Sequence, residues 1–78
     1  DVLLVPNPGS SLVDVLFNNA EAGSHFVMID AAGREVLRLP MEEERTTIDI
    51  TGLSSGIYGY RVLSPSGRTL AVGTCVRE

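Results

Sequence analysis

The chain has no lysine and no tryptophan, only two tyrosines and two phenylalanines, and one cysteine and one histidine. The single Cys75 excludes an internal disulfide, and we expect it to pack as a small hydrophobic side chain in the last strand. One cysteine and His25, with no partnering motif, make a poor metal site or nucleophile pair. We therefore expect no metal, no cofactor and a core that rests on valine, leucine and isoleucine.

Other functional classes are also excluded or disfavoured by what is missing. No apolar run approaches the roughly 18 residues that a membrane-spanning helix needs. The net charge of −4 disfavours nucleic acid and anionic membrane surfaces as partners. Ser54-Ser55-Gly56 lacks the strand-turn-helix setting of a nucleophile elbow, and no glycine-rich loop precedes a helix. We therefore expect this domain not to be an enzyme.

The length of 78 residues with 44% hydrophobic content fits one folded domain. The chain lacks an initiator methionine and opens directly on the apolar stretch Val2–Val5. We therefore expect residues 1–78 to be a single domain excised from a larger secreted protein.

The chain is organised around the stretch Ile48–Leu63. Ile48 and Ile50 alternate with polar residues, which is the period-2 pattern of a half-buried strand. The segment Gly52–Gly56 has two glycines and two serines, so it predicts a turn.

A second strand follows this turn. Tyr58, Tyr60 and Val62 fall on one face of it, and we expect them in the core. Leu53 precedes Tyr58 by five residues, a spacing typical of a tyrosine corner. In such a corner the tyrosine hydroxyl bonds to upstream backbone at the end of a β-sandwich.

Five further segments carry strand patterns: Val2–Val5, Leu12–Phe17, Ser24–Asp30, Glu35–Leu39 and Thr69–Val76. In the second segment, the face without Asp14 should be buried. We expect Phe26 and Met28 to point inward from the third segment and Val36 to be the core residue of the fourth. Pro40–Arg45, with its three glutamates, is expected to be a solvated loop.

Two tight hairpins share a Gly-Arg exit, Asp30–Arg34 and Ser64–Arg68. Gly33 and Gly67 are expected at positive φ, as tight strand connections require. We interpret the similarity as repeated turn chemistry and not as an internal repeat.

The pattern as a whole predicts an all-β fold, a seven-stranded antiparallel immunoglobulin-like β-sandwich. Turn signals recur along the whole chain, and no helical periodicity of useful length is present. A single open sheet is less favoured because it would leave an apolar face in water.

Three segments carry a resemblance to a known family: VPNPG (5–9), VMIDAAGREV (27–36) and IDITGLSSGIYGYRVL (48–63). In this order they resemble the type A C-terminal sorting domain of cargo proteins of the type IX secretion system in Bacteroidota. That family has a Pro-Asn-Pro start, an Asp-x-x-Gly-Arg hairpin and a Leu-x-x-Gly-x-Tyr block. The resemblance covers nearly the whole chain.

The resemblance implies a secretion signal. Its cargo would pass from the periplasm through the type IX system across the outer membrane to the cell surface. The implied partners are outer-membrane components of that system and a sortase, which removes such domains and joins the cargo to lipopolysaccharide. The residues that match family motif positions, and so form the implied recognition site, are Gly33, Arg34, Gly56, Tyr58, Cys75, Val76, Arg77 and Glu78.

The end of the chain departs from the family pattern, because Cys75–Glu78 contains no lysine. Whether the domain is cleaved or retained therefore stays open. We expect Thr69–Glu78 to be a terminal strand whose ladder groups or side chains remain reachable, either by a partner or by a second copy that forms a homodimer.

An alternative function is that of an accessory module of a cell-surface enzyme, either a binding domain or a spacer. A carbohydrate- or protein-binding module needs an exposed aromatic platform or a set of binding loops. All four aromatic side chains are expected in the core, so the platform is missing. The residues alone do not exclude a spacer.

Overall fold

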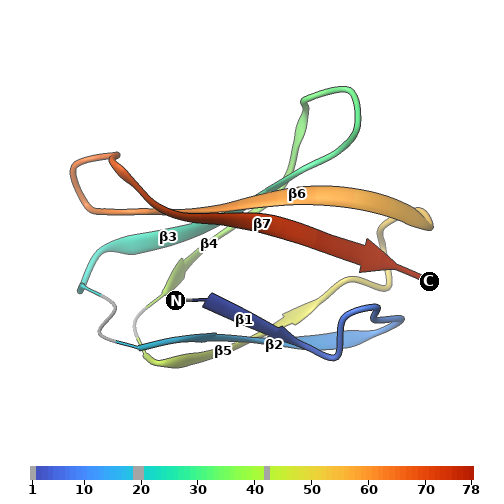
Figure 1. Cartoon of the computed structure of the whole chain (residues 1–78), viewed down its shortest axis with the longest axis horizontal. Coiled ribbons are helices and arrows are strands. Elements are labelled where there is room, and N and C mark those ends of the chain that lie inside the picture. Colours follow the sequence, from blue (N-terminus) through green and yellow to red (C-terminus); the bar gives the residue numbers. More distant parts are fainter. Residues whose placement is uncertain (1, 19–20, 42) are drawn as a thin grey trace.

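The computed structural model describes residues 2–18, 21–41 and 43–78, which form seven strands in two antiparallel sheets packed face to face (Figure 1). One sheet has the order β1-β2-β5 and the other the order β4-β3-β6-β7. The strands are β1 (Val2–Val5), β2 (Leu12–Phe17), β3 (Ser24–Ile29), β4 (Glu35–Met41), β5 (Arg45–Asp49), β6 (Gly56–Leu63) and β7 (Thr69–Arg77). The predicted all-β sandwich is confirmed, and the single open sheet is excluded. The described part of the chain contains no helix that could cross a membrane.

The core lies between the two sheets and consists mostly of aliphatic side chains. The predicted faces of β2, β3 and β6 are confirmed, and Cys75 packs among them at 1% exposure. The rings of Phe26 and Tyr60 stack across the β3–β6 pair with centroids 5.5 Å apart. The buried hydrophobic residues are Leu4, Val13, Val15, Phe17, Phe26, Val27, Met28, Met41, Ile48, Ile50, Tyr58, Tyr60, Val62 and Cys75.

The fourth strand differs from the prediction at its far end. The sequence predicts a loop at Met41, but β4 extends to this residue and its side chain is fully buried. A bulge opposite Met28 and Ile29 leaves Val36 unpaired. Val36 is partly buried against the core, as predicted, and so are Leu37 and Leu39. The strand tolerates Pro40 because β4 is the edge of its sheet.

The fifth strand begins earlier than predicted. Arg45 lies in the predicted loop, yet it opens β5 and pairs with Leu16 of β2. Its guanidinium Nη1 donates to Asp14 Oδ2 at 2.9 Å, and the Thr47 hydroxyl donates to the other oxygen of Asp14 at 2.6 Å. These polar contacts between β5 and β2 lengthen the strand at its start. The prediction missed this part because it relied on the alternation of apolar residues.

The two hairpins have the same hydrogen-bond pattern, and the positive φ of Gly33 (84°) and Gly67 (90°) is confirmed. In both, the first residue accepts from the glycine N–H and donates its own N–H to the carbonyl of the closing arginine. In both, its side-chain oxygen also accepts from the N–H of that arginine, Asp30 Oδ1 from Arg34 and Ser64 Oγ from Arg68. The interpretation as repeated turn chemistry holds.

The connector after β1 closes one end of the sandwich. Gly9 forms a parallel bridge with Arg77 of β7, in which the Gly9 N–H donates to Val76 O and the Glu78 N–H donates to Gly9 O, each at 2.9 Å. Asn7 adds two more bonds of 2.9 Å, accepting from the Val76 N–H and donating to Thr74 O. The ladder groups in the second half of the last strand are therefore bonded to Asn7 and Gly9, while Thr74 and Glu78 in the same half remain exposed.

Candidate functional site

Two of the predicted recognition segments meet at one end of the sandwich and enclose a shallow groove of about 350 Å³. One wall is the Asp30–Arg34 hairpin, and the other is the turn that leads into β6. Gly33 is the residue of the hairpin that permits its tight turn, and Gly56 lies in the opposite wall. The groove is lined by Asp30, Ala31, Ala32, Arg34, Ser54, Ser55, Gly56, Ile57 and Tyr58.

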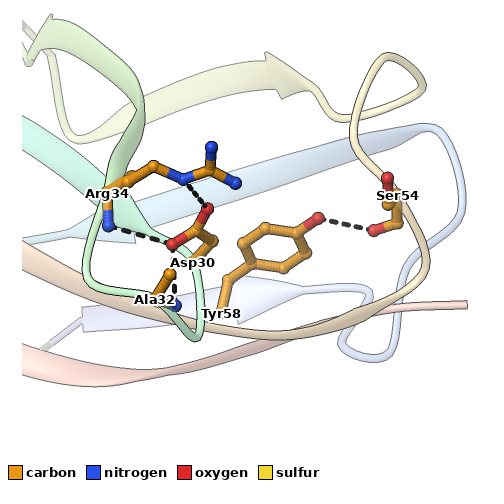
Figure 2. A network of polar contacts seen from close by, with 5 residues as sticks. All are labelled: Asp30, Ala32, Arg34, Ser54 and Tyr58. Carbon is orange, nitrogen blue, oxygen red and sulfur yellow. Dashed lines mark hydrogen bonds and ion pairs between the residues drawn. The ribbon is translucent and has the colours of Figure 1, made fainter.

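Tyr58 fixes the turn wall of the groove. Its hydroxyl donates to the Ser54 carbonyl oxygen at 2.6 Å, four residues upstream, and its ring is 7% exposed. Figure 2 shows the ring lying between the hairpin and the turn, with the hydroxyl pointing to Ser54. The predicted tyrosine corner is confirmed, and it gives the turn a defined position relative to the hairpin.

Asp30 fixes the hairpin wall. Its Oδ1 accepts from the N–H groups of Ala32 and Arg34 at 2.9 Å, and its Oδ2 accepts from Arg34 Nε at 3.0 Å (Figure 2). The backbone N–H of Arg34, together with its guanidinium and the Ala32 N–H, holds the pKa of Asp30 below its ordinary value against a smaller opposing effect of desolvation. The carboxylate is therefore ionised at neutral pH and orients the arginine side chain.

Arg34 presents a cation at the groove. Its side chain is 80% exposed, and only Nε is engaged, by Asp30. The two terminal nitrogens have no hydrogen-bond partner among the described residues. A guanidinium with two adjacent free N–H groups binds a carboxylate or phosphate in bidentate geometry.

Ile57 supplies an apolar contact that the sequence analysis did not single out. It is 67% exposed and lies next to Tyr58, on the opposite face of β6. The signal was present in the alternation, since Ile57 directly precedes the core residue Tyr58 and successive side chains of a strand point to opposite faces. Ser54 and Ser55 also line the groove, although the sequence predicts only a turn at these residues.

Three of the other predicted recognition residues lie at the end of β7, next to the turn wall of the groove, and Glu78 directly follows the strand. Gly56 pairs with Arg77 and Ile57 pairs with Val76. Val76 is half-buried, and Arg77 turns back toward the other sheet, where its Nε donates to the Ile50 carbonyl at 3.2 Å. Arg34, Gly56 and Tyr58 thus line the groove, whereas the end of β7 adjoins it through strand pairing with Gly56 and Ile57.

Cys75 and Glu78 differ from their neighbours in what they offer to a partner. The Cys75 side chain faces the core, and burial raises the pKa of its thiol, so it is neutral at neutral pH. It can influence recognition only through packing. The Glu78 side chain is exposed, while its N–H is bonded to Gly9. Within residues 2–18, 21–41 and 43–78, no group of three or more potential metal ligands comes together.

Comparison with known families identifies the domain. The family model of the secretion system C-terminal sorting domain matches residues 4–71. The chain belongs to this family. The resemblance seen in the motif segments is thereby confirmed, and the match ends before Cys75–Glu78, where the sequence departs from the family pattern. No curated protein matches the chain.

A sorting domain of this family is the C-terminal signal of type IX secretion, and it directs export across the outer membrane to the cell surface or the extracellular space. It works with the type IX secretion machinery. Domains of this kind act as signals and not as catalysts, which fits the expected lack of enzymatic activity. No observation favours the alternative function of an accessory module.

Proposed function

We propose that the export machinery recognises this sorting domain at the groove between the Asp30–Arg34 hairpin and the Ser54–Tyr58 turn. The observation that carries the proposal is that both walls come from family motif segments and are fixed by their own hydrogen bonds, so that the groove is preorganised. Neither wall is needed to fill the core, apart from the Tyr58 ring.

The groove favours a partner segment that presents a carboxylate beside an apolar side chain. The free guanidinium nitrogens of Arg34 bind the carboxylate, and the exposed Ile57 contacts the apolar group. Gly33, Gly56 and Tyr58 shape the site, and the end of β7, Val76–Glu78, borders it. Cys75 supports this end from the core side.

Family membership supports the partners and the route. The partners are outer-membrane components of the type IX system, followed by the sortase. In this proposal residues 1–78 are the sorting domain of a larger cargo protein. The cargo crosses the periplasm, reaches the cell surface and is linked there to lipopolysaccharide after removal of the domain.

The test is a fusion of residues 1–78 to a periplasmic reporter in cells with a working type IX system. We expect the reporter on the cell surface, and retention in the periplasm would contradict the sorting function itself. Arg34→Gln should reduce surface display strongly. Arg68→Gln is the matched control, because Arg68 closes the equivalent hairpin at the opposite end of β6 (Figure 1). Equal loss in both variants would contradict recognition at the groove.

A deletion of Val76–Glu78 should also block export. It removes residues that border the groove, but it also removes both bonds that join β7 to Gly9. The melting temperature of the deletion variant must therefore be compared with that of the fusion that contains all 78 residues. A folded, stable deletion variant that is exported normally would remove the strand end from the recognition site.

A further inference from the structure

The outer edge of β7 is divided into two halves. The half from the Thr74 C=O to the Glu78 N–H is occupied, since four outward-pointing backbone groups there bond to Asn7 and Gly9. These groups belong to alternate residues of the strand, 74, 76 and 78. By the same alternation, the N–H and C=O of Val72 point to the same edge. Because β7 is the edge strand of its sheet, no ladder partner lies on this side, and among the described residues no other backbone group bonds to them.

A second groove lies beside this free half, between β1 and β7, with a volume of about 540 Å³. Its rim is apolar, because Leu3 is 58% exposed and Val72 is 68% exposed. Figure 1 shows β1 of one sheet below β7 of the other, and the groove lies between these two strands. It is separate from the Arg34 groove, with which it shares no lining residue.

Tyr60 is among the residues that line this second groove. It pairs with Gly73 across β6 and β7, and a Cβ atom at Gly73 would overlap the Tyr60 hydroxyl. The ring therefore lies across the glycine, with its polar end at the groove. Apolar walls, a hydroxyl and an open ladder together suit an extended backbone that carries an apolar side chain.

We propose that the free half of the β7 edge, Leu70–Thr74, binds a short extended segment of a partner protein by strand addition. The segment would bond to the Val72 N–H and C=O and place an apolar side chain in the groove beside Leu3. The five residues span about 15 Å at roughly 3.3 Å per residue, so the site takes a segment of four or five residues. The bound segment would lie on the same edge of β7 as Asn7 and Gly9, next to these two residues, and would hydrogen-bond to the strand as they do.

A second copy of this chain fits the edge less well than a short segment does. Antiparallel pairing of two β7 strands about Val72 would place residue 68 of one copy opposite residue 76 of the other. That position is already filled by Asn7 and Gly9. The proposal rests on the proposed function in one respect, namely that the partner belongs to the export machinery.

The backbone chemistry can be tested on the 78-residue chain with a defined probe, a capped peptide of about seven residues with alternating valine and threonine. Without peptide, the Val72 amide should exchange with solvent much faster than the Val76 amide, although both point to the same edge. Added peptide should slow exchange at Val72 and leave Val76 unchanged. Equal protection of both amides in the free domain, or peptide-induced shifts confined to other strands, would overturn the proposal.

Two substitutions at Val72 separate the edge from the fold. Val72→Pro removes an N–H that the domain's own sheet does not use, so the domain should fold while peptide affinity falls about tenfold through loss of a main-chain bond and the added ring. Val72→Thr keeps the N–H and is the matched control, with affinity close to that of the unchanged domain. Equal binding by the proline and threonine variants would count against strand addition.

The reporter fusion tests the biological role. Val72→Pro should reduce surface display while Val72→Thr does not, and the unchanged domain must be exported for the proposed function to hold. If the unchanged fusion is not exported, only the proposed function fails. The peptide experiment still tests whether the free half of the β7 edge binds an extended segment. Normal export of the proline variant would overturn the partner assignment. Protection of the Val72 amide that rises with protein concentration would identify a second copy as the occupant and overturn the proposal of a partner segment.

Discussion

Tyr58 combines a core aromatic ring with a hydrogen bond that sets the groove wall, and the two contributions can be separated. Tyr58→Phe removes only the bond to the Ser54 carbonyl and should lower the free energy of unfolding by about 1 kcal/mol. Tyr58→Ala also removes the ring and should cost roughly 3–5 kcal/mol. Chemical denaturation of both variants measures the difference, and a melting temperature unaffected by Tyr58→Ala would refute the corner's structural role.

Asp30 makes the stability of the hairpin depend on pH. Its pKa is lower in the folded state than its ordinary value, chiefly because of the Arg34 N–H. The ionised carboxylate therefore stabilises the fold fully above the ordinary pKa, and this contribution is lost as the pH falls through the folded-state pKa. Asp30→Asn should be less stable than the unchanged domain at neutral pH, and the gap should close in acid. A gap that stays constant across this range would contradict the assignment.

At the scale of elements, the two hairpins offer an internal comparison. Gly33 and Gly67 have nearly the same positive φ, and at neither does any atom lie within 4 Å of the position that a Cβ would take, so only backbone conformation penalises a side chain there. Gly33→Ala and Gly67→Ala should each destabilise the domain by about 1 kcal/mol. Thermal unfolding of both variants measures this. Only Gly33→Ala should also weaken export, because Gly67 is distant from the Arg34 groove.

The elements also indicate how far sequence reasoning reaches in this fold. Alternation located the faces of β2, β3 and β6, since one side of each faces a shared core. It did not find Met41, because a bulge shifts the period of β4 and Pro40 is typical of a strand end. The Arg34–Tyr58 site was partly predicted from motif positions, but Ile57 was not, because an exposed apolar residue carries no motif of its own. The role of Asn7 depends on contacts to residues 67 and 69 positions away, which no local pattern encodes.

At the scale of the whole molecule, the two sheets are joined along one side by Asn7 and Gly9. Asn7→Ala should lower the free energy of unfolding by about 1–2 kcal/mol, because it removes two hydrogen bonds to β7. Asn7→Asp keeps an acceptor for the Val76 N–H but loses the donor to Thr74 O, so its effect should be smaller. Hydrogen exchange of the Val76 amide provides the direct measurement. If this amide still exchanges slowly in Asn7→Ala, the Asn7 side chain does not join the two sheets.

The same junction has a consequence for the order of events during biosynthesis. The ribosome translates Asn7 before its partners in β7, which follow 67 and 69 positions later, and β6 gains its second neighbour only then. The two-sheet structure therefore cannot form progressively behind the growing chain, and non-local pairing of this kind is slow to form. A nascent polypeptide that stalls before residue 74 would carry an incomplete sheet with an exposed β6 edge, open to proteases and chaperones. The complete two-sheet fold can therefore form only after the ribosome has translated β7.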